Sequence, residues 1–282
     1  MNYVIICTVG RSGSTLLQGI LNGIDGYCIR GENDNFLFGL YMSYYSLLTC
    51  STIEKGTSSI HPWYGSDIFD LDQFINDSRK IVINQFRFPR GIKTAGFKEI
   101  RWTSPYLHGK YLHDYLEFIN LIFKDVKFIF LTRDLHEIYE SQVRAGFGTQ
   151  EKGYDYFSEH VIDFYEKMRS SNLPIFEIDY KDITFLSEKM VSMFEFLDAD
   201  YNVDRIRSII STEHSFANAK KFTSTALVPS TLLSTAAPTQ PPERSADYTG
   251  IELEVGGTVV RIGPQASEPQ IRAVIRGLKS RL

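Results

Sequence analysis

The residues with the clearest chemistry lie near the N-terminus, in the sequence Gly-Arg-Ser-Gly-Ser-Thr of residues 10–15. An apolar run precedes them, and the apolar residues Leu16, Leu17, Ile20 and Leu21 then recur at helical spacing. A strand, a tight polar turn and a helix in this order direct backbone N–H groups and the positive end of a helix dipole at an anion. The sequence therefore predicts a phosphate-binding loop. An ordinary Ser/Gly turn that caps a helix is the simpler alternative.

The loop differs from that of nucleoside triphosphatases, which ends in Gly-Lys-Ser or Gly-Lys-Thr and uses its lysine to reach the terminal phosphates. Ser14 stands in the place of that lysine. Arg11 supplies the fixed charge instead, and a planar guanidinium suits oxyanions. The wording Gly-Arg-Ser-Gly-Ser-Thr-Leu-Leu resembles the 5′-phosphosulfate loop of sulfotransferases, most closely the carbohydrate and bacterial branch. The resemblance implies a catalytic as well as a binding role for Arg11, and binding of 3′-phosphoadenosine-5′-phosphosulfate (PAPS) by Arg11, Ser12, Gly13, Ser14 and Thr15.

A second motif follows a buried-type strand predicted near residues 126–131. It consists of Arg133 and Asp134, then a helix predicted over Leu135 to Arg144 that carries Ser141. The spacing of Arg133 and Ser141 is similar to the 3′-phosphate signature of sulfotransferases, which implies that a guanidinium and a hydroxyl bind one phosphate. Asp134 is expected to cap and orient the helix. The residue after Arg-Asp is leucine where the family usually has proline.

Two further charged residues are candidates for the transfer chemistry. Sulfuryl transfer to an alcohol must remove the hydroxyl proton, and a partly desolvated carboxylate can take it. Glu32 stands where the resemblance implies this general base, with Asp34 as the alternative. The Gly-Phe-Lys-Glu-Ile-Arg sequence of residues 96–101 also occurs in bacterial relatives of the family. It implies that Lys98 balances charge on the sulfuryl group or the leaving phosphate, with Arg101 as a candidate for binding either substrate.

These residues need a scaffold that brings their loops together. Apolar runs alternate with helical patterns, which predicts strands near residues 4–9, 92–102, 126–131 and 174–178. Strands and helices in this succession predict a parallel sheet covered by helices on both faces, with ligands at the carboxyl ends of the strands. We therefore expect an α/β sulfotransferase fold in which both anion motifs share one edge of the sheet.

Length and composition are those of one large folded domain. The chain has 282 residues, of which 43% are hydrophobic and 23% charged, enough for a sizeable α/β core. A formal net charge of −4 argues against a general polyanion binder, so nucleic acid is not expected as a partner. Cys7, Cys28 and Cys50 show no metal-ligand spacing, which favours neither a metal site nor a disulfide framework.

The location of the protein is inferred from its apolar segments. The N-terminal sequence enters the first predicted strand without a basic region and a long apolar core. No run of about 18 apolar residues occurs along the chain. We therefore expect no integral membrane segment and a reducing, cytoplasmic setting. Animal carbohydrate sulfotransferases carry a Golgi anchor. Because no such anchor is expected in this sequence, the resemblance favours a bacterial enzyme.

Composition changes near residue 225. The chain has 20 Phe, 16 Tyr and 2 Trp, yet only Tyr248 of these lies after Thr225, whereas six of the ten prolines do. This change predicts three parts, which are a sulfotransferase domain, a Pro/Ser/Thr-rich linker and a small ββα appendage, over residues 1–225, 226–246 and 247–282.

The appendage has a pattern of its own. Residues 251–255 and 258–262 alternate around Gly256-Gly257, which predicts a β-hairpin, and residues 268–282 follow a short basic helix pattern. The succession resembles the C-terminal part of the accessory protein of a bacterial insertion sequence, which implies a gene fusion. A native appendage used for association is the alternative.

The motifs together predict an enzyme that transfers the sulfuryl group of PAPS to a hydroxyl and leaves adenosine 3′,5′-bisphosphate (PAP). A carbohydrate or another small or lipid-linked molecule is the expected acceptor, and Trp63 and Tyr64 are candidates to stack on a sugar face. This chemistry needs no metal. Two alternatives stay open: a magnesium-dependent P-loop kinase, which Ser14 in place of lysine disfavours, and an inactive nucleotide-binding remnant of the fusion.

Overall fold

The computed structural model describes residues 1–53, 58–103, 107, 111–147 and 149–212, together with the backbone of residues 251–255 and 258–262. The chain divides into two compact units, Met1–Lys221 and Phe222–Leu282. The predicted linker, residues 226–246, and the predicted helix, residues 268–282, lie outside the described residues.

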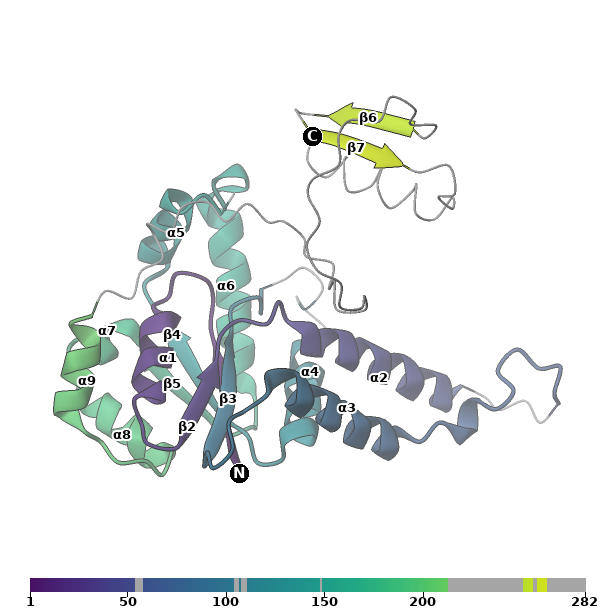
Figure 1. Ribbon diagram of the computed structural model, residues 1–282, viewed down its shortest axis with the longest axis horizontal. Coiled ribbons are helices and arrows are strands. Elements are labelled where there is room, and N and C mark those ends of the chain that lie inside the picture. The colour runs from purple at the N-terminus through teal and green to yellow at the C-terminus, as the bar shows by residue number, and fades with distance from the viewer. Residues whose placement is uncertain are drawn as a thin grey trace, which may run out of the picture. The chain divides into compact units, whose positions relative to one another are not determined.

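A five-stranded parallel sheet forms the centre of the first unit (Figure 1). In spatial order its strands are β2 (Tyr27–Arg30), β3 (Thr94–Glu99), β1 (Asn2–Cys7), β4 (Lys127–Thr132) and β5 (Ile175–Asp179). β1 pairs with both β3 and β4, so the loop after β1 emerges from the middle of the sheet. Strands that are covered on both faces are mostly apolar, so the apolar runs in the sequence were enough to predict β1 and β4. The predicted parallel α/β fold is confirmed.

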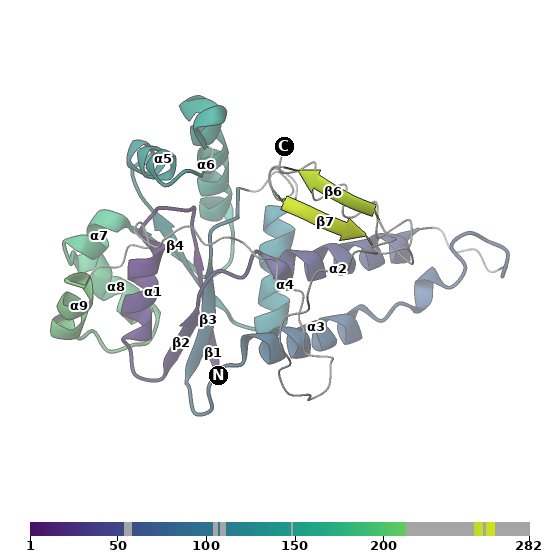
Figure 2. The same cartoon turned by 45° about the horizontal axis from the view of Figure 1, so that its top comes forward.

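Helices cover both faces of this sheet (Figures 1 and 2). On one face lie α1 (Ser14–Asn22), α7 (Tyr180–Thr184), α8 (Glu188–Phe196) and α9 (Val203–Ile210). On the other face lie α2 (Phe36–Thr52), α3 (Leu71–Phe86), α4 (Leu112–Phe123), α5 (Leu135–Arg144) and α6 (Gly153–Ser170). Because side chains alternate along a strand, β1 serves both layers: Val4 and Ile6 pack with the first group, and Ile5 and Cys7 pack with the second.

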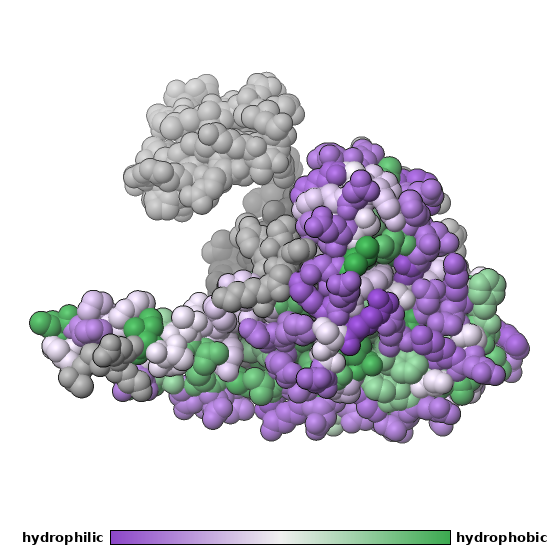
Figure 3. All heavy atoms as spheres, turned by 180° about the vertical axis from the view of Figure 1, so that it is seen from behind, coloured by the Kyte–Doolittle hydropathy of each residue, from purple (hydrophilic) through white to green (hydrophobic). Residues whose placement is uncertain are grey.

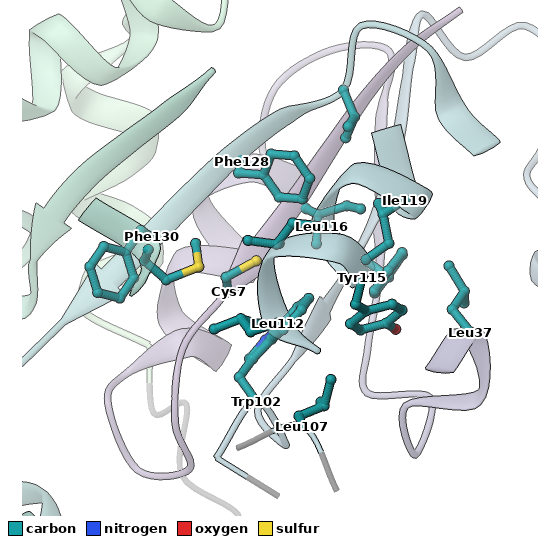
Figure 4. Close-up of a cluster of buried hydrophobic side chains, with 14 of the residues drawn as sticks. Cys7, Leu37, Trp102, Leu107, Leu112, Tyr115, Leu116, Ile119, Phe128 and Phe130 are labelled. Atoms are coloured by element: carbon teal, nitrogen blue, oxygen red, sulfur yellow. The ribbon is translucent and has the colours of Figure 1, made fainter. Parts of the chain in front are cut away.

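The larger apolar cluster lies between the sheet and α4 (Figure 4). Its largest fully buried side chains are aromatic, and they include Trp102, Tyr115, Phe128 and Phe130. The rings of Trp102 and Tyr115 lie 5.6 Å apart at their centroids. This packing holds the chain segment that follows β3 against α4.

An arm built from α2, α3 and the short 3₁₀ helix η1 (Ser66–Ile68) extends from the sheet (Figures 1 and 2). The N-cap of α3, Asp70, accepts a hydrogen bond from the N–H of Gln73. Apolar side chains are exposed at the end of this arm (Figure 3), among them Ile60, Trp63, Tyr64, Ile68 and Phe69.

The sequence analysis did not predict one strand, β2. The sequence predicts residues 92–102 as the second strand, but β2 precedes β3 along the chain and lies at the sheet edge. β2 has only four residues, and Ile29 is its one buried side chain, so neither a long apolar run nor regular alternation marks it. β3 also ends earlier than predicted, at Glu99.

The described backbone of the second unit is a β-hairpin. β6 (Ile251–Val255) and β7 (Thr258–Ile262) pair antiparallel, with Val255 opposite Thr258. This confirms the strands predicted on either side of Gly256-Gly257.

Candidate functional site

The carboxyl ends of the strands surround a cleft of about 420 Å³. Its lining combines residues that follow all five strands: Gly10, Arg11, Gly13, Ser14, Thr15, Leu16, Glu32, Lys98, Ile100, Arg133, Ser141, Phe147, Tyr180, Ile210 and Thr212. The residues to which the resemblance assigns PAPS binding or catalysis line this cleft, except Ser12. The alternatives Asp34 and Arg101 do not line it. The lining carries three cationic side chains and one carboxylate, so the cleft suits an anion.

The loop after β1 takes a shape that exposes a helix terminus. Arg11 (φ 72°) and Gly13 (φ 96°) both have left-handed backbone conformations. Gly13 is the N-cap of α1, and because it has no side chain, no side chain caps the helix. The first turn of α1, Ser14 to Leu16, lines the cleft. Its N–H groups and the positive end of the helix dipole are therefore arranged for an anion.

The hydroxyl of Ser12 braces this loop from inside. Ser12 is fully buried, and its Oγ lies 2.8 Å from Thr8 Oγ1. Thr8 in turn donates to the carbonyl of Leu131 at 2.6 Å. This chain of contacts ties the loop to β4, so the side chain of Ser12 supports the loop without reaching the cleft.

Tyr180, the first residue of α7, closes the other side of the loop. A Cβ atom at Gly13 would lie 2.3 Å from Tyr180 Cδ2, so only glycine fits between the loop and this ring. The guanidinium carbon of Arg133 lies 4.4 Å from the centroid of the same ring, in a cation–π contact. Tyr180 thus packs against both the loop and the Arg133 guanidinium.

The second motif comes together with the first through Arg11. Arg11 Nε donates to Ser141 Oγ at 3.0 Å, and Arg133 Nη1 donates to the backbone carbonyl of Arg11 at 3.1 Å. Arg133 is also paired with Glu137, one turn into α5, at 2.9 Å. The two guanidinium groups and the Ser141 hydroxyl therefore meet at one wall of the cleft.

The expected cap of α5 is confirmed. Asp134 Oδ1 accepts a hydrogen bond from the N–H of Glu137 at 3.0 Å. This bond holds the pKa of the Asp134 carboxyl below its usual value. The cap fixes the first turn of α5, from which Glu137 holds Arg133.

β3 brings an ammonium group to the loop, which has no lysine of its own. Lys98 Nζ lies 3.3 Å from Thr15 Oγ1 and 3.5 Å from Ser14 Oγ. Its register partner on β1 is Ile6, so Lys98 reaches the first turn of α1 from the neighbouring strand. Its side chain is only 8% exposed. A buried ammonium at this place adds charge where the helix dipole is also positive, which favours an anionic ligand.

Glu32 and Asp34 have different surroundings. Glu32 Oε1 accepts from Lys98 Nζ at 2.7 Å, and the Glu32 side chain is 36% exposed. Asp34 is 86% exposed and contacts Arg101 Nε at 3.0 Å. Glu32 lines the cleft, whereas neither Asp34 nor Arg101 does. The geometry thus favours Glu32 over Asp34 as a group that acts on a bound molecule.

A second cavity has a volume of about 270 Å³. Phe147 lines both cavities, and the second is also lined by Thr103, Thr149, Lys152, Tyr156, Phe157, His160 and Val161. Its wall is formed mainly by α6 and the short 3₁₀ helix η2 (Thr149–Glu151). Trp63 and Tyr64 line neither of these two cavities and lie at the end of the α2–α3 arm.

Several lining residues were missed by the sequence analysis. Tyr180 directly follows β5, and its place just after a predicted strand was a usable signal. Phe147, Ile210 and Thr212 carry no such signal, because they come from loop and helix ends that reach the cleft only through the tertiary fold.

The described part of the chain holds neither a metal-ligand cluster nor a membrane-spanning helix. In residues 1–212, apart from the undescribed gaps, no group of three His, Cys, Asp or Glu side chains is arranged to hold a metal ion. No described helix is long and apolar enough to cross a bilayer. The three cysteines are free thiols.

The chain is similar to solved sulfotransferase structures. The sulfotransferase domain of the Synechococcus PCC 7002 olefin synthase is 16% identical, with a TM-score of 0.49 over 76% of this chain and 78% of that chain. The sulfotransferase domain from the curacin biosynthetic pathway is 14% identical, with a TM-score of 0.48 over 76% and 79%. Retinol dehydratase in complex with androsterone and the inactive cofactor PAP is 15% identical, with a TM-score of 0.34 over 74% and 63%. No protein-family model and no curated protein matches the chain. At these identities the likeness concerns the fold alone.

Proposed function

We propose that the protein is a sulfotransferase that moves the sulfuryl group of PAPS to a hydroxyl of an acceptor. One observation carries this proposal: two anion-binding motifs far apart in the sequence share a cleft with a buried ammonium that is paired with a carboxylate. The first motif suits a 5′-phosphosulfate and the second a 3′-phosphate, as the resemblance of their sequences implies.

The residues of the cleft fit PAPS by their donor set. The first turn of α1 with Ser14 and Thr15 would hold the 5′-phosphosulfate at its exposed N–H groups. Arg133 and Ser141 would hold the 3′-phosphate, because guanidinium and hydroxyl groups are strong donors to phosphate oxygens. The apolar part of the lining, Leu16, Tyr180 and Ile210, would contact the nucleoside. PAPS, when bound, supplies an activated sulfuryl group.

Glu32 and Lys98 are proposed to carry the proton and charge chemistry. Glu32 presents a partly exposed carboxylate to the cleft and would take the proton of the acceptor hydroxyl. Lys98 donates to Glu32 and lies beside Ser14 and Thr15, so it orients the base and offers positive charge at the place of transfer. Arg11, which bridges the loop and Ser141, adds a second fixed charge.

The acceptor is proposed to be a carbohydrate or another small or lipid-linked alcohol that occupies the second cavity. Aromatic side chains contribute much of that wall, and flat aromatic faces pack against the apolar faces of sugar rings. Lys152, Thr103 and Thr149 add hydrogen-bonding groups. The shared residue Phe147 makes the two cavities neighbours, as a direct transfer requires.

The C-terminal residues are proposed to lie outside this chemistry. The change of composition near residue 225 and the separate hairpin support a fused appendage. We infer a transposable element as its source from the resemblance of its sequence.

A binding experiment separates the sulfotransferase from its rivals. Calorimetric titration of the full chain with PAP is compared with titration with ATP and magnesium. Micromolar binding of PAP supports the proposal, preference for ATP with magnesium indicates a kinase, and binding of neither indicates an inactive remnant. Transfer of labelled sulfate from PAPS to a panel of sugar and aryl alcohols then tests the acceptor class, and transfer to aryl alcohols alone would overturn the carbohydrate assignment.

A further inference from the structure

Glu99, the last residue of β3, is a fully buried carboxylate with an unusual set of partners. Its Oε1 accepts hydrogen bonds from the N–H groups of Ile100 at 2.8 Å and Arg101 at 3.1 Å. Its Oε2 accepts from the N–H groups of Asn33 at 3.3 Å and Asn35 at 2.9 Å. One side chain therefore joins the chain that leaves β3 to the loop that follows β2. Arg101 Nη1 also lies 3.5 Å from Glu99 Oε1. Such a buried charge is stable because it is multiply hydrogen-bonded and paired with a guanidinium.

The loop after β2 needs this support because its backbone is strained. Asp34 (φ 56°) and Asn35 (φ 55°) are consecutive left-handed residues, and neither is glycine. Tyr115 braces the same loop by donating from its hydroxyl to Asn35 Oδ1 at 2.8 Å. Burial, and then the charge of Glu99, raises the pKa of Tyr115, so the hydroxyl remains a donor. Figure 4 shows Tyr115 on α4, on the side where Leu37 lies in the first turn of α2.

The two segments that Glu99 joins carry Glu32 and Lys98. Glu32 directly precedes the loop residue Asn33, and Lys98 directly precedes Glu99. Side chains alternate along β3, so Lys98 lies on the α1 face while Glu99 lies on the other face. Glu99 itself does not line the cleft. Its influence on a bound molecule therefore passes through the position of Glu32.

We propose that Glu99 is a positioning residue that sets the distance between the Glu32 carboxylate and the Lys98 ammonium by clamping the loop after β2 to the end of β3. The proposal rests on the proposed function of Glu32. It goes beyond that function because it assigns the positioning of the Glu32 carboxylate to a residue that touches neither substrate.

The test is a double-mutant cycle with Glu99→Gln and Glu32→Gln. An amide has one acceptor oxygen, so in either orientation the side chain of the Glu99→Gln variant loses one pair of N–H partners and the link between the segments breaks. We expect turnover to fall by about 10- to 100-fold, as a small misplacement of a reacting group produces. Affinity for PAP should change by less than about 3-fold, since Glu99 is outside the cleft.

The decisive measurement is turnover of the double variant. If Glu99 acts through Glu32, then Glu99→Gln has little further effect when Glu32 is already replaced by glutamine. The proposal would be overturned if the turnover losses of the two single variants add in the double variant. It would also be overturned if turnover of Glu99→Gln does not fall, or falls together with its PAP affinity. Glu117→Gln, the same change at an exposed residue of α4, is the matched control and should leave all these values unchanged.

A structural readout accompanies the kinetic one. Amide hydrogen exchange of residues 33–35 and 100–101 should speed up in Glu99→Gln and stay as in the parent in Glu117→Gln. If Glu99→Gln does not fold, Glu99→Asp takes its place in the cycle, because it keeps the charge but is one methylene too short to reach both segments.

The failure of this proposal is distinct from failure of the proposed function. If the parent protein neither binds PAP nor transfers sulfate, the proposed function fails, and hydrogen exchange alone decides whether Glu99 clamps the loop. If the parent is active, but Glu99→Gln leaves amide exchange unchanged or the turnover losses in the cycle are additive, only the role of Glu99 fails.

Discussion

Arg11 and Ser141 lie 130 residues apart in the chain, and Arg11 Nε donates to Ser141 Oγ at 3.0 Å. The sequence motifs pair Ser141 with Arg133, whereas the structure gives its hydroxyl to the arginine of the first loop. Arg133 is held beside them by Glu137, Tyr180 and the carbonyl of Arg11. One wall of the cleft therefore carries two guanidinium groups and a hydroxyl, an arrangement that suits a phosphate better than either motif alone.

Arg133→Ala and Ser141→Ala should each weaken PAP binding far more than binding of adenosine 5′-phosphate. Their proposed partner is the 3′-phosphate, and a charged hydrogen bond contributes about 1.5–3 kcal/mol, or roughly 10- to 150-fold in affinity. Calorimetric titration with both nucleotides measures the difference.

Arg144→Ala is the matched control for these variants. Arg144 lies on α5 with Ser141, is paired with Glu140 and does not line the cleft, so its loss should leave both affinities unchanged. Equal losses for the two nucleotides in Arg133→Ala would contradict the assignment to the 3′-phosphate.

Glu32→Gln should lower turnover by about 100-fold or more while PAP still binds. The amide keeps the size of the side chain but cannot take the hydroxyl proton. Asp34→Asn, two residues away on the same loop, should have little effect because Asp34 is exposed and contacts Arg101 outside the cleft. Single-turnover rates with PAPS measure both variants, and a loss confined to Asp34→Asn would transfer the role to Asp34.

Asp134→Ala should lower the free energy of unfolding by about 1 kcal/mol at neutral pH, because it removes the N-cap of α5. The pKa of Asp134 is lower in the folded protein than in the unfolded chain. A group of this kind contributes stability above its unfolded pKa and loses that contribution as the pH falls through its folded pKa. The difference between parent and variant should therefore shrink below about pH 4.

Urea unfolding of the parent and the variant across this pH range measures the difference. Asp134→Asn is the control, because asparagine also caps helices but does not titrate, so its advantage over alanine should stay constant with pH. A difference between parent and Asp134→Ala that grows on acidification would contradict the assigned direction of the pKa shift.

Removal of residues 226–282 should leave the first unit folded. Both apolar clusters of the described residues end by Ile210, so the cut takes nothing from them. A hairpin with one short helix has a small core and contributes little. The melting temperature of residues 1–225 should lie within about 3 °C of the full chain, the change that roughly 1 kcal/mol produces. Unfolding or loss of PAP binding on truncation would show that the appendage takes part in the site.

Local elements were predictable where neighbouring residues decide the conformation. The bounds of α5 coincide with the prediction because Asp134 caps the helix by accepting a bond from the N–H of Glu137, three positions on. β1 and β4 were predictable because strands covered on both faces must be apolar throughout. β2 was not, because a four-residue edge strand with one buried side chain has almost no pattern.

The sequence by itself determined which residues are candidates to bind an anion, because a phosphate loop is a local structure of glycine, hydroxyl and arginine residues. The tertiary structure alone decided how they are used: Ser12 turns inward to Thr8, and Arg11 rather than Arg133 contacts Ser141. It also showed that Lys98 supplies the ammonium group that the loop lacks, and that buried Glu99 holds the loop of Glu32. The physical reason is that these contacts join segments tens of residues apart, so they depend on strand order and register, such as Ile6 opposite Lys98, which no local pattern encodes.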